Sequence, residues 1–378
     1  MKIIKAEARY IHYTSYMVRD GEGHSHPGDS HDAQWPIFTI TCDDGTVGHA
    51  IGGRMDVPVL NSVVAPALIG EDPFMREKIW QRMRTWQRLH PTFNDRTLNA
   101  MDLALWDICG KKCGQPVYKM LGGYRDRVAA YGSIMVGDTI KGGLDTPQAY
   151  ADYALQLVER GYTAIKLHTW MPPLIPEPSV KLDIEACRMV REAVGPDIGL
   201  ILDPYHDYSR QEAYYLAREL EKLDFLWLEE PMDENSMLSY QWLQSKTGLA
   251  ICGPETAAGK AQNRAAWIVN NAADLGRAGT ETMGGITAAM KIVHLYESFG
   301  MSVEMHGGTI GNLHILGAMG NSKYYERGML HPLLDYETPQ PWFNSLYDPM
   351  DSEGMVSIPQ NPGLGWDLNM DYIENNLL

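Results

Sequence analysis

The sequence contains few cysteines, and they follow no regular pattern. There are five among 378 residues, an odd number with scattered spacing, which argues against a disulfide framework. Cysteines used in this way are typical of proteins whose thiols stay reduced. We therefore expect free thiols at all five positions, which are Cys42, Cys109, Cys113, Cys187 and Cys252.

Positive charge and long apolar runs are also scarce. The chain has 32 lysine and arginine residues against 48 aspartate and glutamate residues, a net charge of −16, which disfavours nucleic acid or an anionic membrane as a partner. No apolar run is long enough for a transmembrane helix. The first 15 residues alternate polar and apolar side chains like a strand and lack the features of a signal peptide. We expect a soluble, cytoplasmic protein. Small anionic substrates remain possible, because a bound divalent ion sets the potential within a site.

Three carboxylates recur at a constant interval. Asp203, Glu229 and Glu255 are 26 residues apart (203 to 229 and 229 to 255), and each closes an apolar run, namely IGLILD, FLWLEE and LAICGPE. Short apolar runs separated by helix-forming stretches are typical of strands buried on both faces. In a barrel of such strand-helix units, the carboxyl ends of neighbouring strands meet at one mouth. The spacing therefore predicts that the three acidic side chains converge.

Three converging carboxylates repel one another unless a cation lies between them. A hard divalent ion with oxygen ligands, Mg²⁺, would relieve the repulsion and leave coordination positions for water and substrate. Any one of these acids could instead be a helix N-cap. The shared spacing of all three favours the metal.

The chain divides into three parts. Residues 1–125 read as an α+β lobe with a hairpin at 36–51, where the letters DDG mark a turn. Residues 126–327 alternate strand and helix patterns, and residues 328–378 return to complete the first lobe. Residues 21–31 have no apolar anchors and predict a mobile loop. This loop is either a lid or specificity loop over the barrel mouth or simply disordered.

Several segments together resemble the enolase superfamily and, within it, the mandelate racemase subgroup. Their order and spacing match over nearly the whole chain. The segments include AMDLALWDICGKKCGQPVYKMLGG at 100–123, AIKLH at 164–168, WLEEP at 227–231, GPE at 253–255, GGI at 284–286, VEMHG at 303–307 and PGLG at 362–365.

The resemblance implies a fold, a cofactor and a first chemical step. The fold is α/β, a modified TIM barrel of the (β/α)7β type with an N-terminal α+β capping domain that the C-terminal tail completes. The cofactor is Mg²⁺ held by Asp203, Glu229 and Glu255, with Glu229 preferred over Glu230 in WLEEP. The first step is removal of the proton α to a carboxylate, and a homo-oligomer is expected.

Lys166 and His168 are candidates for the base that removes this proton. They are two apart on one strand, so both side chains point into the barrel. His168 is the first choice, because an imidazole needs less tuning than an ammonium group to act near neutral pH. Lys166 would then hold the substrate carboxylate. Most relatives with this strand carry lysine at both positions, so the histidine leaves open which of the two is the base.

His306, in VEMHG, is a second catalytic candidate on the opposite side of the barrel. In relatives an aspartate five residues before the GG pair orients this histidine, but here Gly279 occupies that position. Asp274 lies at the other end of its strand and is not a substitute. Without an acidic partner His306 is expected to be an acid, a hydrogen-bond donor or a substrate contact. Chemistry with one base favours dehydration over racemisation.

Three further residues are weaker candidates for binding substrate. His206 follows Asp203 in DPYHDY, where it could contact a substrate oxygen or serve only as a turn histidine. Glu326, in YYERG, falls where relatives place an acidic group near the substrate carboxylate. His90, in the first lobe, could reach the mouth from outside.

Together with the resemblance, which implies the substrate class, the sequence predicts a Mg²⁺-dependent lyase that removes water from a sugar acid, an aldonate or an aldarate such as galactarate, to give a 2-keto-3-deoxy acid. Cycloisomerisation or racemisation through the same enediolate is the first alternative. An aldose isomerase or metal hydrolase would use ligands richer in histidine or bridging ligands. A non-catalytic binding protein with the same fold would not bind Mg²⁺.

Overall fold

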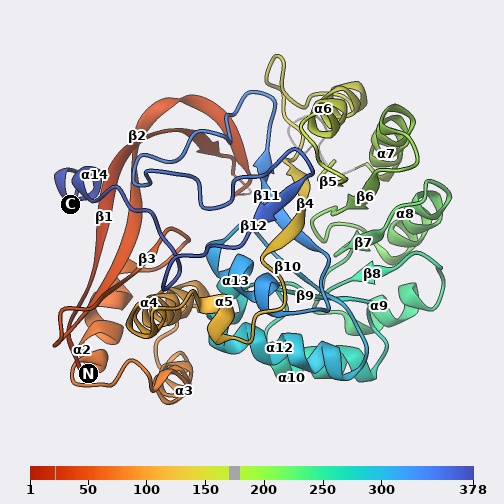
Figure 1. Ribbon diagram of the computed structural model, residues 1–378. Coiled ribbons are helices and arrows are strands. Elements are labelled where there is room, and N and C mark those ends of the chain that lie inside the picture. Colours follow the sequence, from red (N-terminus) through yellow and green to blue (C-terminus); the bar gives the residue numbers. More distant parts are fainter. Residues whose placement is uncertain (22, 170–178) are drawn as a thin grey trace.

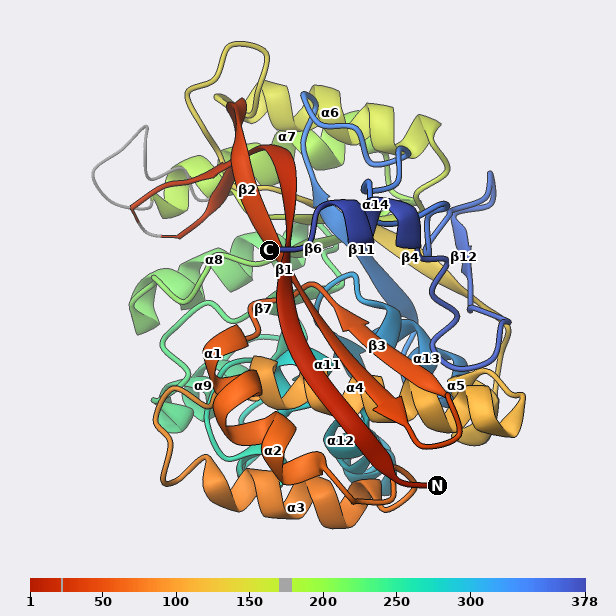
Figure 2. The ribbon, with the colours of Figure 1, turned by 90° about the vertical axis from the view of Figure 1, so that its left-hand side faces the viewer.

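The protein folds into an N-terminal capping domain packed against a parallel α/β barrel (Figures 1 and 2). The computed structural model describes residues 1–21, 23–169 and 179–378. Within these ranges no helix is both long and apolar enough to cross a membrane. All five cysteines are free thiols, as the sequence predicts.

The capping domain is built on a three-stranded antiparallel sheet in the order β1-β2-β3. The predicted hairpin at 36–51 is confirmed, with Ile37 opposite Ile51 and Thr41 opposite Val47. Gly45 has a positive φ of 83° in its turn, a backbone conformation that favours glycine. The strands are β1 (Ile3–Arg19), β2 (Ser25–Cys42) and β3 (Val47–Ile51).

The prediction of a loop over residues 21–31 is wrong for most of that segment. Strand β2 begins at Ser25, and its first residues pair with the end of β1, Ser25 with Arg19 and His31 with Ser15. The turn is held by Asp20, whose carboxylate accepts the His24 backbone N–H at 2.9 Å. The segment lacks apolar anchors because this ribbon is largely exposed. Its backbone groups are satisfied by the partner strand, which a search for apolar anchors does not detect.

The helices of the capping domain surround one long, deeply buried helix, α4. Its N-cap Asn94 accepts the Thr97 N–H, and its C-cap Gly114 is left-handed with φ 64°, so both ends have the residues that helix termini favour. The others are α1 (Val57–Val59), the π-helical turn η1 (Leu60–Val64), α2 (Ala65–Leu68), α3 (Arg76–Trp86), α4 (Asp95–Cys113) and α5 (Val117–Met120).

Helix α4 also joins the capping domain to the barrel. The buried Asp102 accepts hydrogen bonds from the backbone N–H of Thr287 at 2.9 Å and from its hydroxyl at 2.6 Å. The Trp80 indole donates to the Gly284 carbonyl at 2.7 Å. These buried polar contacts hold the cap in a defined position over the barrel.

The barrel strands run parallel, and their order follows the sequence. The pairing starts with β11 beside β4 and continues through β5, β6, β7 and β8. A bridge between Cys252 and Leu275 leads to β9, which pairs with β10, and β10 in turn contacts β11. The strands are β4 (Arg127–Ile134), β5 (Ala164–Leu167), β6 (Gly199–Leu202), β7 (Trp227–Glu229), β8 (Ile251–Cys252), β9 (Gly276–Ala278), β10 (Val303–Met305) and β11 (Tyr324–Leu330).

Helices cover the outside of the barrel (Figure 1). Helix α8 begins with the reciprocal capping box of Ser209 and Glu212, which satisfies two backbone donors at once. The helices are α6 (Pro147–Glu159), α7 (Val180–Val194), α8 (Arg210–Lys222), α9 (Met237–Gln244), α10 (Lys260–Val269), α11 (Thr280–Met283), α12 (Ile286–Ser298) and α13 (Ile310–Ala318).

The C-terminal segment contacts both domains. Strand β12 (Met355–Ser357) pairs with β4 of the barrel. Helix α14 (Met370–Asn375) then lies against the cap sheet (Figure 2), and the Leu378 N–H donates to the Tyr10 carbonyl. Ile373 packs in a small apolar cluster with Ile11. The tail therefore reaches the first lobe, as the sequence predicts, after one strand on the barrel.

Candidate active site

The carboxyl ends of the barrel strands bring the predicted polar residues to one mouth. Lys166 lies in β5, Asp203 directly follows β6, and Glu229 is the last residue of β7. Glu255 lies three residues beyond β8, and Glu326 lies in β11. All five side chains are buried. The apolar strands thus present these groups where the active sites of parallel barrels lie.

The ammonium group of Lys166 joins three of these carboxylates. Its Nζ lies 3.2 Å from Asp203 Oδ2 and 2.9 Å from both Glu229 Oε1 and Glu326 Oε1. Burial lowers the pKa of Lys166, but Glu229 and Glu326 outweigh it and raise the pKa well above its usual value. Lys166 is therefore a cation suited to holding a carboxylate.

Arg277, in β9, is a site residue that the sequence analysis missed. Its Nε lies 2.9 Å from Glu229 Oε1 and 3.4 Å from Glu255 Oε2, and its Nη2 lies 2.6 Å from Glu326 Oε2. The side chain is fully buried. The sequence did contain a signal for this role, an arginine inside the short strand segment ADLGRAG. A guanidinium group buried in a strand requires carboxylate partners, so the residue could have been placed among the acids of the mouth.

Buried negative charge exceeds buried positive charge at the mouth. Burial raises the pKa of Glu255 to about 8 even though Arg277 acts in the opposite direction. Such uncompensated burial is costly unless a cation or a proton is added. All the acidic donors are oxygen atoms, so the donor set fits a hard divalent ion such as Mg²⁺. Two permanent cations, Lys166 and Arg277, pair with four buried carboxylates, Asp203, Glu229, Glu255 and Glu326, and a fifth, Glu230, lies beside Glu255.

His168 is buried beside Asp203 with its ring held in place. Its Nδ1 lies 2.5 Å from the Ile134 carbonyl and its Nε2 lies 3.2 Å from Asp203 Oδ2. A carbonyl only accepts hydrogen bonds, so Nδ1 carries the proton and Nε2 is the basic atom in the neutral ring. The Tyr150 hydroxyl donates to the His168 carbonyl at 2.8 Å. The histidine is therefore oriented as a base whose active nitrogen faces the carboxylates.

His306 lies across the mouth in a different setting. Its Nε2 is 3.1 Å from Glu255 Oε1, and its Nδ1 has no hydrogen-bond partner among the residues that the structure describes. A Cβ on Gly279 would lie 3.4 Å from the His306 Cβ, so the glycine occupies the place beside the ring from which an aspartate would act. Burial lowers the pKa of His306 to about 4.

Asp274 lies away from His306, as the sequence analysis expects. Its carboxylate accepts the Ile251 N–H at 2.9 Å and the Gln244 amide at 3.1 Å. It therefore holds the start of β8, at the end of the barrel opposite the mouth.

The weaker candidates differ in where they lie. His206 Nε2 is 3.3 Å from Glu230 Oε2, and its backbone is left-handed with φ 67°, a conformation that is uncommon outside glycine and often found at functional sites. Glu326 contacts Lys166 and Arg277, within the carboxylate group. His90 lies in the turn between α3 and α4, where its carbonyl accepts the Phe93 N–H, and it has no contact with this group in the described ranges.

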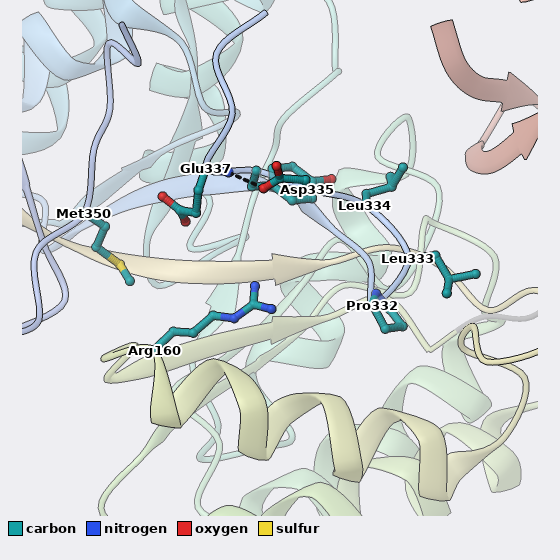
Figure 3. Close-up of a pocket in the computed structure, with 8 residues that line it drawn as sticks. Arg160, Pro332, Leu333, Leu334, Asp335, Glu337 and Met350 are labelled. Atoms are coloured by element: carbon teal, nitrogen blue, oxygen red, sulfur yellow. Dashed lines mark hydrogen bonds between the residues drawn. The ribbon is translucent and has the colours of Figure 1, made fainter. Parts of the chain in front are cut away.

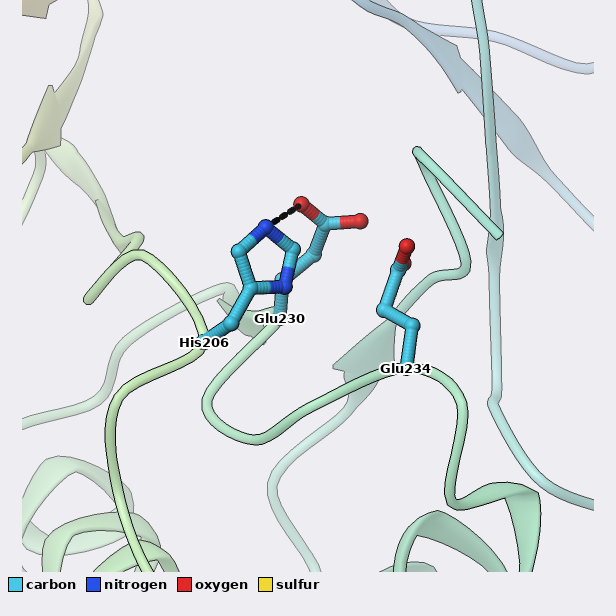
Figure 4. A group of neighbouring side chains, drawn as sticks. All are labelled: His206, Glu230 and Glu234. Atoms are coloured by element: carbon cyan, nitrogen blue, oxygen red, sulfur yellow. Dashed lines mark ion pairs between the residues drawn. The ribbon is translucent and has the colours of Figure 1, made fainter. Parts of the chain in front are cut away.

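Three further potential metal ligands lie close together (Figure 4), and one of them, Glu230, contacts Glu255 of the predicted triad. One ligand atom from each of His206, Glu230 and Glu234 lies within 4.8 Å of the others. Glu234, however, accepts the backbone N–H groups of Thr256 and Ala257 at 2.7 and 2.8 Å. Its carboxylate thus anchors the turn that presents Glu255, which suits a supporting role rather than a ligand.

The capping hairpin reaches the mouth at its tip. The His24 ring packs edge to face against Tyr205 with 4.9 Å between ring centroids, and Tyr205 lies 5.0 Å from the His168 ring. The cap therefore contacts residues next to both His168 and Asp203.

Another cavity lies away from the mouth (Figure 3). It measures about 650 Å³ and is lined by Arg160, at the end of α6, and by the segment 332–337 after β11. None of its lining residues belongs to the carboxylate group. It therefore contributes nothing to the chemistry of the mouth.

Comparison with protein families identifies both domains. The model for the mandelate racemase / muconate lactonizing enzyme N-terminal domain matches residues 24–122, and the model for an enolase C-terminal domain-like region matches residues 149–372. The second match alone covers more than half of the chain. This protein belongs to the mandelate racemase and muconate lactonizing enzyme family. The family match confirms the resemblance to the enolase superfamily, with its capping domain and α/β barrel.

Relatives in this family include several enzymes that act on sugar acids. A D-gluconate dehydratase from Thermoproteus tenax is 30% identical over 91% of this chain and 70% of its own length. A D-galactarolactone cycloisomerase from Agrobacterium fabrum is 28% identical over 89% of each chain. A crystal structure of a D-glucarate dehydratase from Agrobacterium tumefaciens, complexed with magnesium, is 48% identical, with a TM-score of 0.97 over 100% of this chain and 99% of that chain.

Proposed function

We propose that this protein is a Mg²⁺-dependent dehydratase of sugar acids that yields 2-keto-3-deoxy acids. The observation that carries the proposal is the unequal pair of histidines. His168 has its basic nitrogen oriented by a backbone carbonyl, whereas His306 lacks an acidic partner at Gly279. The names of the gluconate and glucarate dehydratases among its relatives support the same reaction.

The metal would be held by Asp203, Glu229 and Glu255, as the sequence predicts. When bound, Mg²⁺ would stabilise the charge that builds up on the substrate carboxylate after proton removal. The oxygen donors of these three residues and the excess of buried negative charge support this assignment. Glu234 would hold the Glu255 turn in place.

Lys166 would contribute a second positive charge to the same carboxylate. Its ammonium group lies among Asp203, Glu229 and Glu326, so a substrate carboxylate at the mouth would be within its reach. A cation fixed there lowers the energy of the enediolate more than that of the substrate, because the enediolate carries more charge on its oxygens. Arg277 would keep Glu229 and Glu326 in position from below.

His168 would transfer the proton. Its Nε2 takes the hydrogen of the carbon next to the carboxylate, and the electron pair of the broken C–H bond forms the enediolate. The same proton then protonates the hydroxyl group on the neighbouring carbon, which leaves as water. The resulting enol tautomerises to the 2-keto-3-deoxy acid. One base is sufficient for this syn elimination, whereas racemisation needs groups on both faces.

The test is a screen of the purified protein with Mg²⁺ against aldonates and aldarates, with semicarbazide to detect 2-keto acids. A keto acid formed by the wild type and lost in His168→Gln supports the proposal. If no keto acid forms but deuterium from D₂O enters the α-position of an acid, the protein is an epimerase or a cycloisomerase. The galactarolactone cycloisomerase among its relatives makes that second outcome a specific alternative.

A further inference from the structure

A separate cavity lies between the capping domain and the barrel mouth. Its volume is about 460 Å³, within the range of small-molecule sites. The cap contributes Arg19, Arg54 and Asn99 to its lining, and the barrel contributes Glu281 and Thr309. Thr309 lies three residues beyond His306, so the cavity adjoins the segment that carries the second histidine.

Positive charge in this cavity exceeds the negative charge that the chain supplies. Arg96 lies 3.7 Å from Glu281. Arg19 and Arg54 have no ion pair with any carboxylate in the described part of the chain. Partial burial lowers the pKa of Arg54. The positive charges of Arg19 and Arg96 lower it further, whereas Glu281 and Tyr205 act in the opposite direction. Three guanidinium groups therefore lie close to one carboxylate.

A buried polar side chain in the same cavity has an unused hydrogen-bonding atom. Asn99, in α4, is only 7% exposed, and its Oδ1 has no hydrogen-bond partner among the described residues. Buried amide groups nearly always have partners. A ligand hydroxyl reaching this part of the cavity would supply one.

These observations point to a substrate with a charge at each end. A six-carbon aldonate ends in a neutral hydroxymethyl group, which cannot compensate two guanidinium groups. An aldarate ends in a second carboxylate, the group that arginine binds best through paired hydrogen bonds. The hydroxyls between its two ends would pass Asn99.

We propose that Arg19 and Arg54 bind the distal carboxylate of the substrate and so select aldarates over aldonates. This inference rests on the proposed function, because it places the reacting carboxylate near Lys166 and the reacting carbon at His168. The second carboxylate then extends towards the cap, on the His306 side of the mouth.

The experiment compares pairs of acids that differ only at the far end, glucarate with gluconate and galactarate with galactonate. Affinity is measured by calorimetry with Mg²⁺ on the His168→Gln protein, which keeps the ligand intact. Turnover is measured on the wild type. We expect at least one aldarate to bind about 10- to 100-fold more tightly than its matched aldonate, as a charge-assisted hydrogen bond implies.

Three substitutions test the assigned residues, each made in the His168→Gln protein for binding and in the wild type for turnover. Arg54→Met and Arg19→Met keep most of the aliphatic part of the side chain and remove its charge. They should abolish most of the preference for the aldarate while leaving aldonate binding nearly unchanged. Arg54→Lys should retain part of the preference, because it keeps the charge but loses the paired donors. The matched control is Arg188→Met, in an exposed arginine of α7 that pairs with Glu192, and it should change neither affinity.

The outcomes separate this inference from the proposed function. Equal affinity for both members of each pair, or an equal loss for both in Arg54→Met, overturns the inference even if a keto acid is formed. If no keto acid forms from any acid, the proposed function fails. Selective aldarate binding that depends on Arg54 would still support the subsite in that case.

Discussion

The two sides of the barrel mouth present a histidine in two different settings. On the β5 side, His168 is held by the Ile134 carbonyl and is nearly fully buried. On the β10 side, His306 is partly exposed, its Nδ1 has no partner in the described ranges, and Gly279 stands beside it. The same side chain is thus an oriented base in one place and a loosely held polar group in the other. The two rings differ in the residue beside them, Ile134 for His168 and Gly279 for His306. This difference suits chemistry from one face of the substrate.

The largest effect should come from the carboxylates that both sides share. Asp203→Asn removes a predicted metal ligand and a charge that faces Lys166 and His168. We expect Mg²⁺ affinity to fall and turnover to drop by about a thousandfold or more. Calorimetry with Mg²⁺ and steady-state kinetics measure both. Unchanged Mg²⁺ binding would remove Asp203 from the ligand set.

The second-largest loss of turnover should come from His168, and it distinguishes the two histidines directly. His168→Gln removes the base and retains a side chain able to donate to Ile134. We expect turnover and deuterium exchange at the α-carbon to fall together by about 100- to 1000-fold. Exchange that persists at the wild-type rate in this variant would assign the proton transfer to another group, with Lys166 or His306 as candidates.

A stability effect is expected from the strand that carries His306. Burial raises the pKa of Glu304, in β10, from 4.5 to about 7. A carboxyl whose folded pKa is raised stabilises the fold while it is protonated, and that stability is lost as the pH rises from about 4.5 to about 7. The loss amounts to about 3 kcal/mol.

Glu304→Gln tests this by remaining neutral at every pH. The difference in unfolding free energy between about pH 5 and about pH 8, measured with denaturant, should be smaller in the variant than in the wild type. An equal difference in both proteins would mean that Glu304 ionises at its usual pH in the folded state.

The smallest effect should come from the loosely held histidine. His306→Gln keeps a polar side chain near Glu255 and removes the imidazole. Because Gly279 leaves its Nδ1 without an acidic partner in the described ranges, we expect turnover to fall by about tenfold or less. A loss as large as that of His168→Gln would contradict the one-base reading and favour groups acting on both faces of the substrate.

Some of these features follow from local sequence pattern. The apolar runs that end in Asp203, Glu229 and Glu255 predict buried strands and a shared mouth, and the structure has each residue at or just beyond its strand end. The glycine at position 279 is also visible in the sequence, but its consequence for His306 is implied by the resemblance to relatives that carry an aspartate there. The apolar runs can be recognised in the sequence because the pattern of a strand is set by residues that are close together in the chain.

Other features required contacts between distant parts of the chain. Nothing near Arg277 in the sequence indicates that it joins Glu229 to Glu326, 48 residues before it and 49 after it. The early residues of β2 have no strand pattern and are ordered by pairing with β1. Asn99 reads as one more polar residue of a helix until the cap and barrel enclose it.

Local sequence pattern was sufficient for the strand-helix repeat and for the three acids at equal spacing. Each of these depends on residues close together in the chain, or on a repeat that sets equivalent positions in the barrel. The tertiary structure decided the tautomer of His168, the ion pairs of Lys166 and Arg277, and the cationic cavity under the cap. These depend on which side chains meet across the barrel and its cap, and such contacts exist only after long-range packing is complete.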